Sequence, residues 1–246
     1  MNTASVAVTE MLPVAVEPVK ALIVADGDIP GRDGLDAAWP GWSDAIGLVV
    51  AADGGAVGAE RLGLSIDLVV GDMDSLDADH LARLRGAGIT VEQAPIDKDE
   101  SDTELAVRAA LARGARRLTI VGAFGGRRLD HTLANIGLLL LPELGEREAE
   151  LLDATTRLTV LRAPDGAGRS VRRELPGRVG DLVSLLPFGI DAQGVTTEGL
   201  RYPLAGGTLL AGPARGLSNV RLRPDAAVTL GRGILLVVES PATLVP

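Results

Sequence analysis

The first half of the chain alternates short apolar runs with stretches of helical periodicity, and this alternation most constrains the fold. The apolar runs, rich in Val, Ile and Leu, lie at 21–25, 48–52, 66–70, 89–92 and 118–122. Helical patterns follow near 55–62, 77–86, 102–113 and 131–141. Strands that alternate with helices form parallel βαβ units. The sequence therefore predicts an α/β fold with a doubly wound, mostly parallel sheet for this half.

The second half follows a different pattern, in which Gly or Pro separates short apolar runs about every 8–12 residues, as in antiparallel sandwiches. These predicted strands are 158–161, 181–186, 195–197, 207–211, 217–222, 226–230 and 234–239. The polar segment 142–149 separates the two patterns. We therefore expect a flexible tail over residues 1–19, an α/β domain over 20–146 and an all-β, antiparallel β-sandwich domain over 147–246.

Composition excludes several chemistries. The 246-residue chain contains no cysteine, so disulfides, a thiolate nucleophile and Cys-ligated metals are excluded. No apolar run approaches the roughly 20 residues that a membrane-spanning helix needs. The chain has no basic residue before Lys20, and Glu10 and Pro13 interrupt its first apolar stretch, which is unlike a secretory signal. We expect a cytoplasmic protein with no membrane partner.

Acidic residues are concentrated in the first half. Residues 1–146 hold 23 of the 33 acidic residues but only 12 of the 24 basic ones, and ten of the acids lie between positions 72 and 104. Such a negative field repels nucleic acid and attracts cations. A solvated acidic face would have the same composition, so the spacing of the acids has to separate the two interpretations.

A first candidate motif, Asp53-Gly54-Gly55, follows the predicted strand 48–52. Open α/β sheets bind ligands at the carboxyl ends of their strands. Asp53 would stand at that edge, and the two glycines would let backbone amides approach a phosphate or sugar without an intervening β-carbon. An ordinary Asp-Gly-Gly turn is the simpler interpretation of this motif.

A second motif, GDMDS at 71–75, follows the predicted strand 66–70. Asp72 and Asp74 are two residues apart, so in an extended segment their side chains share a face and can bind one hard cation. Two carboxylates this close repel each other unless a metal compensates their charge. A helix cap at this position would explain one acid but not both, so we expect a metal site here.

The acidic segment 97–104 leads into a predicted helix. Mg²⁺ binds a couple of carboxylates together with water and phosphate oxygens, so Asp72, Asp74 and Asp102 with a nucleotide would suffice for a magnesium site. Lys98 is one of two lysines in the chain and lies among these acids. It could contact a phosphate, although a local salt bridge is the simpler interpretation.

The segment 122–131 (GAFGGRRLDH) links a predicted strand to a helix. Glycines at such a turn, followed by two arginines, suit a polyphosphate held by backbone amides and a guanidinium. His131 is a candidate general base, but a single histidine at a helix start more often makes a structural hydrogen bond. In that simpler interpretation Asp130 or His131 caps the helix.

Seven motifs, in this order, resemble the thiamine pyrophosphokinase family and cover roughly residues 20–240. They are ADGG (52–55), GDMDS (71–75), KDESDTELA (98–106), GAFGGRRLDHTLANI (122–136), SLLP (184–187), GLRYPL (199–204) and GLSN (216–219). One such motif is a weak signal, whereas seven in register across both predicted domains are specific.

The resemblance implies an N-terminal α/β domain, a C-terminal β-sandwich and a homodimer whose active sites lie between domains of partner subunits. It also implies an enzyme that transfers a pyrophosphoryl group from its co-substrate ATP to the hydroxyethyl oxygen of thiamine, releasing AMP, with Mg²⁺ required. Thiamine carries a permanent positive charge, so a strongly acidic first domain suits this acceptor electrostatically.

By motif position, the resemblance places three groups of residues in the active site. The metal-binding and catalytic acids are Asp72, Asp74 and Asp102. The nucleotide and phosphate site contains Asp53, Gly54, Gly55, Lys98, Asp99, Gly125, Gly126, Arg127, Arg128 and Asp130. The thiamine pocket is bordered by Asp130, His131, Ser218 and Asn219. The family turn GGRxDH is one residue longer here, GGRRLDH, so either arginine is a candidate for the phosphate contact.

Three alternatives stay open at this point. A related pyrophosphokinase acting on a hydroxymethyl pterin has similar acidic motifs but a neutral acceptor. A metal-dependent glycosyltransferase would also use an Asp-x-Asp pattern, but it leaves 98–106 and 122–131 unexplained. A non-catalytic nucleotide-binding protein would be favoured by loss of a metal carboxylate, and here all three candidates are present.

Overall fold

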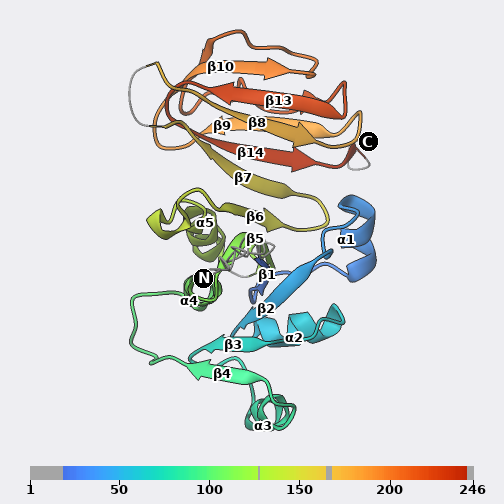
Figure 1. Cartoon of the computed structure of the whole chain (residues 1–246), viewed down its shortest axis with the longest axis vertical. Helices are drawn as coiled ribbons and strands as arrows, with labels where there is room; N and C mark the ends of the chain where they lie inside the picture. The colour runs from blue at the N-terminus through green and yellow to red at the C-terminus, as the bar shows by residue number, and fades with distance from the viewer. Residues whose placement is uncertain (1–18, 127, 165–167, 243–246) are drawn as a thin grey trace, which may run out of the picture.

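The computed structural model describes residues 19–126, 128–164 and 168–242. Arg127 and the predicted tail, except for Val19, therefore lie outside the described residues. A ten-stranded sheet runs along the molecule, and a four-stranded sheet packs on one end of it (Figure 1). No helix in this described part is long and apolar enough to cross a membrane.

Six strands form the parallel part of the large sheet. They are β1 (Val19–Val24), β2 (Ile46–Ala52), β3 (Leu68–Gly71), β4 (Thr90–Gln93), β5 (Ala115–Val121) and β6 (Glu148–Leu152). Their order is β6-β5-β1-β2-β3-β4, and every neighbouring pair is parallel. The order of the strands thus reverses between β1 and β5. In doubly wound sheets, the carboxyl ends of the strands at such a switch point form the crevice that binds ligands.

Helices cover both faces of the parallel strands (Figure 1). They are α1 (Arg32–Ala38), α2 (Gly55–Arg61), α3 (Ala78–Gly86), α4 (Asp102–Ala112) and α5 (Leu129–Leu138), followed by the 3₁₀ turn η1 (Pro142–Leu144). One buried apolar cluster joins Ala106 of α4 and Leu138 of α5 to the strands. A second cluster joins Leu35 of α1 and Ala59 of α2 to the other residues of the same strands. This is the arrangement of a doubly wound sheet.

Helix α4 begins where its sequence signals predict. The hydroxyl of Ser101 accepts a hydrogen bond from the backbone amide of Glu104 at 3.1 Å, which caps the helix. Gly114, with a φ of 84°, follows the other end of the helix. Because the cap fixes Asp102 in the first turn, its carboxylate lies at the edge of the sheet where the strands end.

The remaining strands form an antiparallel sandwich. One layer continues the large sheet beyond β6 with β7 (Arg157–Arg162), β14 (Ile234–Ser240), β9 (Leu182–Pro187) and β12 (Asn219–Val220). The other layer contains β8 (Val171–Pro176), β13 (Asp225–Leu230), β10 (Ala192–Glu198) and β11 (Gly207–Leu209). Buried side chains fill the space between the layers, among them Val183, Val195, Val228 and Leu235.

The predicted fold class, a parallel α/β part followed by an antiparallel sandwich, is confirmed. The prediction omitted α1, β6 and β8. Helix α1 is short and has no side-chain cap, and both β6 (EAELL) and β8 (VRRELP) are rich in charged residues, which weakens their apolar pattern. The predicted boundary between two domains at residues 146 and 147 remains a prediction. The large sheet continues through β6 into β7, so no break in the sheet marks this boundary.

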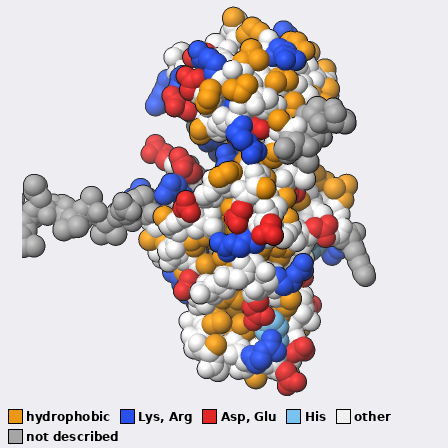
Figure 2. All heavy atoms as spheres, turned by 90° about the vertical axis from the view of Figure 1, so that its right-hand side faces the viewer, with side chains coloured by type: hydrophobic (Ala, Val, Ile, Leu, Met, Phe, Trp, Pro, Cys, Tyr) orange, Lys and Arg blue, Asp and Glu red, His pale blue; other side chains and the backbone are white. Residues whose placement is uncertain are grey.

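Contacts at the junction connect the α/β part to the sandwich. Arg178 donates hydrogen bonds to the carbonyls of Ala37 and Ala38 at 3.0 and 2.9 Å, and Trp39 Nε1 donates to the carbonyl of Asp153 at 2.6 Å. Figure 2 shows the molecule narrowing between the sandwich above and the α/β part below, with acidic and basic side chains interspersed on the face in view.

Candidate active site

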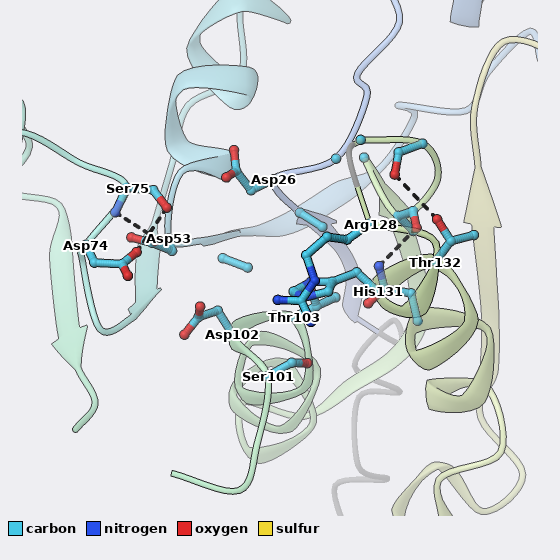
Figure 3. Close-up of a pocket in the computed structure, with 18 of the residues that line it drawn as sticks. Asp26, Asp53, Asp74, Ser75, Ser101, Asp102, Thr103, Arg128, His131 and Thr132 are labelled. Carbon is cyan, nitrogen blue, oxygen red and sulfur yellow. Dashed lines mark hydrogen bonds between the residues drawn. The ribbon is translucent and has the colours of Figure 1, made fainter. Parts of the chain in front are cut away.

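A pocket of about 400 Å³ lies at the carboxyl ends of β1, β2 and β5, beside the amino ends of α4 and α5 (Figure 3). This is the crevice at the switch point between β1 and β5. Its charged and titratable lining residues are Asp26, Asp53, Asp72, Asp74, Asp102, Arg128 and His131. Figure 3 shows the labelled acidic side chains separated from Arg128 and His131 across the pocket. The two sides therefore differ in charge.

Asp53 is the most buried carboxylate of the pocket, with 3% of its surface exposed. Its backbone amide donates to the carbonyl of Val70 at 2.9 Å, so β3 fixes its position. Oδ2 accepts a hydrogen bond from the backbone amide of Ser75 at 3.2 Å, whereas Oδ1 is buried and has no partner among the described residues. A buried carboxylate oxygen without a donor is costly unless a cation binds it.

Asp72 and Asp74 are on the loop that follows β3, and they lie beside Asp53, which follows β2. One carboxylate oxygen from each of the three lies within 4.8 Å of the others. Asp72 Oδ1 accepts a hydrogen bond from the backbone amide of Asp74 at 3.2 Å, and the Ser75 hydroxyl donates to Asp74 Oδ1 at 3.2 Å. Three carboxylate oxygens at this separation form a hard-oxygen set suited to Mg²⁺.

The ammonium of Lys98 lies between Asp72 and Asp102, 2.8 Å from Asp72 Oδ2 and 3.1 Å from Asp102 Oδ1. Only 10% of the Lys98 side chain is exposed. The hydrogen bond from Lys98 lowers the pKa of Asp72. Burial opposes the charge of Lys98, but its interactions with the carboxylates of Asp72 and Asp102 outweigh burial and raise the pKa of Lys98. The local salt bridge predicted as the simpler role of Lys98 is therefore present.

The negative field of the pocket acts on Asp53 and Asp26, neither of which forms an ion pair with a described residue. Burial raises the pKa of Asp53, and the charges of Asp102 and Asp74 raise it further against the hydrogen bonds from Ser75. Burial also raises the pKa of Asp26, again assisted by Asp102 and Asp74. A divalent cation would relieve this mutual repulsion.

Sequence reasoning missed Asp26. It lies two residues after the end of β1, and its carboxylate is so close to Gly54 that a β-carbon on Gly54 would be 2.6 Å from Asp26 Oδ1. The available signal was an acidic residue at the end of the predicted strand 21–25, the same signal that identified Asp53. Gly54 and Gly55 do not line the pocket. Gly55 is required for packing, because a β-carbon there would lie 2.0 Å from the carbonyl oxygen of Val24.

The turn after β5 supplies the other side of the pocket. Gly125 and Gly126 line it and have φ values of 72° and 75°, which glycine adopts without strain. Asn135 of α5 holds the turn by donating from Nδ2 to the carbonyl of Ala123 at 2.9 Å. The turn therefore has the backbone that the glycine pattern predicted.

Arg128 and His131 extend from this turn and from α5 toward the pocket (Figure 3). Arg128 pairs with Asp130 through Nη2 and Oδ2 at 2.5 Å, and both side chains are largely exposed. Asp130 does not line the pocket. Arg127, the alternative phosphate contact, lies outside the described residues. Between the two arginines, Arg128 is the one that the described structure places at the pocket.

Besides Gly54, Gly55, Lys98 and Asp130, which do not line the pocket, three further predicted residues lie away from it. Asp99 is exposed and is not among the lining residues. Ser218 and Asn219 belong to the sandwich, where the amide of Ser218 donates to Ser184 Oγ at 2.9 Å and Asn219 Oδ1 accepts from the amide of Tyr202 at 2.9 Å. One chain therefore does not bring the predicted thiamine residues of the sandwich to the acidic pocket.

Comparison with known proteins links both parts of the chain to one family. Residues 41–149 match the family model for the thiamin pyrophosphokinase catalytic domain, and residues 171–235 match that for the thiamin pyrophosphokinase vitamin B1 binding domain. The curated thiamine pyrophosphokinase of Bacillus subtilis (strain 168) is 26% identical over 200 residues, which cover 81% of this chain and 90% of that protein.

Solved structures agree with the sequence comparison. The crystal structure of thiamine pyrophosphokinase from Bacillus subtilis has a TM-score of 0.75 at 27% identity and covers 90% of this chain and 98% of its own. A thiamin pyrophosphokinase family protein from Enterococcus faecalis has a TM-score of 0.74 at 27% identity, with 90% and 99% covered. Because the two family models together match more than half of the residues, and the fold is shared, this chain belongs to the thiamine pyrophosphokinase family of enzymes.

Proposed function

We propose that this protein transfers a pyrophosphoryl group from ATP to the hydroxyl of thiamine, giving thiamine pyrophosphate and AMP, in a reaction that requires Mg²⁺. The observation that carries the proposal is the cluster of Asp53, Asp72 and Asp74, whose oxygens lie within 4.8 Å of one another at the switch-point crevice. Family membership defines the reaction class, and this cluster would hold the Mg²⁺ whose positive charge phosphoryl transfer needs.

Asp72, Asp74 and Asp102 are the proposed magnesium ligands, and the geometry adds Asp53 to them. The fit rests on the buried Asp53 Oδ1, which lacks a donor among the described residues, and on the hard oxygens of Asp53, Asp72 and Asp74. Asp102 is not part of that close group, and Lys98 lies between it and Asp72. Bound Mg²⁺ would supply positive charge that offsets the negative charge of the phosphates in the transition state.

The remaining groups of the pocket position the nucleotide in this proposal. Backbone amides of the turn at Gly125 and Gly126 and the guanidinium of Arg128 bind phosphate oxygens, since this side of the pocket has the positive and amide donors. Lys98 orients Asp72 and Asp102 through its two short ion pairs. Fixed orientation of the acceptor oxygen in line with the phosphorus accounts for much of the rate in such transfers.

The proposed acceptor site contains Ser218 and Asn219 together with Asp130 and His131. Because these two pairs do not meet within one chain, we propose a homodimer in which the sandwich of one subunit completes the pocket of the other. The match of residues 171–235 to a vitamin B1 binding domain favours thiamine over a hydroxymethyl pterin as acceptor.

The test is ³¹P NMR of the purified protein with ATP, Mg²⁺ and thiamine, with one control lacking thiamine and one containing EDTA. We expect AMP and thiamine pyrophosphate to appear together and only with metal. If hydroxymethyl pterin is turned over and thiamine is not, the acceptor assignment is wrong. If neither is turned over, the catalytic proposal itself is wrong.

A further inference from the structure

A second and larger cleft of about 1210 Å³ lies where the α/β part meets the sandwich, beside β6, β7 and β14 of the large sheet. Its walls are the segment from Leu139 to Ala149, the carboxyl end of β7, the start of β8 and the residues before β14. It shares no lining residue with the acidic pocket, which lies at the carboxyl ends of the parallel strands. Nothing in the proposed reaction uses it.

Four arginines from different segments line this cleft, namely Arg147, Arg162, Arg173 and Arg232. The only acidic residue among its described lining residues is Glu146, which is exposed. None of the four arginines forms an ion pair with a described residue, although the chain has 33 acids and a net charge of −9. The cleft is therefore a positive region on a negative protein, and it attracts anions.

The four guanidinium groups differ in how many of their hydrogen-bond donors are already used. Arg147 donates to the backbone carbonyls of Ala115, Glu143 and Leu144, and Arg162 donates to that of Leu140. In contrast, the side chains of Arg173 and Arg232 have no hydrogen-bond partner among the described residues. Each guanidinium has five N–H donors in a planar fork that matches phosphate oxygens.

Arg173 is the most informative of the four, because its side chain is half-buried. Burial lowers the pKa of Arg173, although the charges of Glu148 and Glu239 act in the opposite direction. Glu239 is itself paired with Arg221 at 2.5 Å, so it does not neutralise Arg173 directly. A partly desolvated cation that forms no ion pair with a described residue is stabilised by an anion that binds beside it.

Apolar side chains form part of the cleft wall. Its lining includes Leu139, Val160, Ile190 and Ile234, and Ile190 is 55% exposed. Small-molecule sites combine apolar walls with a few convergent polar groups. The cleft, at about 1210 Å³, is larger than the usual range of about 300–1,000 Å³, so a small ligand would fill only part of it. The cleft thus suits a ligand with both an anionic group and a ring or chain.

We propose that this cleft binds a phosphorylated organic ligand of small size, whose phosphate contacts Arg173 and Arg232 and whose organic part packs on Ile190 and the neighbouring apolar side chains. The site lies apart from the acidic pocket, so binding here does not depend on the proposed transfer reaction or its metal. Phosphate is favoured over carboxylate because four guanidinium groups offer more charge and more donors than one carboxylate can use.

The experiment is isothermal titration calorimetry of the full chain in EDTA, with inorganic pyrophosphate and ADP as probes. Without a divalent cation, the acids of the other pocket repel both probes, so binding reports mainly on the arginine cleft. The double variant R173Q/R232Q should bind both probes about tenfold or more weakly, because it loses charge-assisted hydrogen bonds. The single variant Arg232→Gln, at an exposed site, guards against loss of folding and should weaken binding in the same direction.

The matched control is R83Q/R85Q, which removes the same charge from exposed positions of α3 at the far end of the α/β part (Figure 1). It should bind both probes as the wild type does. Ile190→Ser should weaken ADP binding several-fold and leave pyrophosphate binding unchanged. Turnover of thiamine should stay normal in all of these variants, which separates this site from the proposed active site.

Three results would overturn the proposal. The first is absence of binding to the wild type at millimolar probe. The second is equal weakening in R173Q/R232Q and R83Q/R85Q, which would indicate general charge attraction. The third is wild-type affinity in R173Q/R232Q, which would place the bound probe elsewhere.

Discussion

The carboxylate of Asp26 lies directly against Gly54, so that a β-carbon at Gly54 would be 2.6 Å from Asp26 Oδ1 and 2.8 Å from Oδ2. Gly54 itself has ordinary helical torsions, with φ of −55° and ψ of −16°. An alanine at this position would therefore displace the Asp26 carboxylate without straining the backbone. The pair fixes where the Asp26 carboxylate can lie relative to Asp74 and Asp102.

This contact predicts that Gly54→Ala and Asp26→Asn act through the same group. Each should weaken activation by Mg²⁺ about three- to tenfold, because each removes or displaces a negative charge that faces the metal cluster. In the double variant D26N/G54A the two losses should not add. Mg²⁺ titrations of turnover for the two single variants and the double variant measure this, and fully additive losses would contradict the contact as the cause.

Removing a proposed metal ligand should abolish turnover without unfolding the protein. Asp72→Asn or Asp102→Asn should lower kcat by several orders of magnitude, since charge stabilisation in the transition state depends on these carboxylates. Circular dichroism and the thermal midpoint should stay close to wild type. Asp79→Asn, on the exposed face of α3, is the matched control and should turn over normally. Near-normal kcat in both ligand variants would contradict their assignment.

The sequence predicted the site best where a residue's position follows from its own strand or helix. Asp72 and Asp74 were found because β3 is a clear apolar run that ends just before them, and Asp102 because Ser101 caps a periodic helix. These are local relationships within a few residues. The fold class followed from the same local patterns.

Relationships across the sheet were not predictable in this way. Asp53 joins the metal cluster because its Oδ2 accepts from Ser75, 22 positions away. The position of Asp26 beside Gly54 depends on β1 and β2 being neighbours in the sheet, which a single sequence does not specify. Strand β6 escaped detection because Glu148 and Glu150 interrupt its apolar residues, although the strand pairs with β5.

Replacing Lys98 should raise the affinity for Mg²⁺ and lower kcat. Its ammonium neutralises part of the charge of Asp72 and Asp102 from 2.8 and 3.1 Å, and so competes electrostatically with a cation. Lys98→Gln should bind Mg²⁺ about tenfold more tightly and yet have a lower kcat, because the two carboxylates lose the group that orients them. Calorimetry with Mg²⁺ and steady-state kinetics measure the two effects. Weaker Mg²⁺ binding in this variant would contradict an electrostatic role for Lys98.

The buried carboxylate of Asp53 should make the stability of the folded protein depend on pH and on bound metal. Burial raises its pKa above the ordinary 3.8, so the folded protein binds this proton more tightly than the unfolded chain does. Its favourable contribution is therefore present below the unfolded-state pKa and is lost as the pH rises through the raised folded-state pKa. In EDTA, Asp53→Asn should raise the thermal midpoint at neutral pH by on the order of 2 °C, because the amide carries no charge to bury.

The same substitution should remove stabilisation by metal. Mg²⁺ at about 100 times its Kd stabilises a folded protein by about 2.7 kcal/mol, and Asp53→Asn should lose most of this, whereas Asp79→Asn should keep it. Thermal unfolding of the three proteins at pH 4 to 8, with Mg²⁺ and with EDTA, measures both effects. A midpoint that falls in EDTA on substitution, or an undiminished response to Mg²⁺, would show that Asp53 stabilises the fold and does not bind the metal.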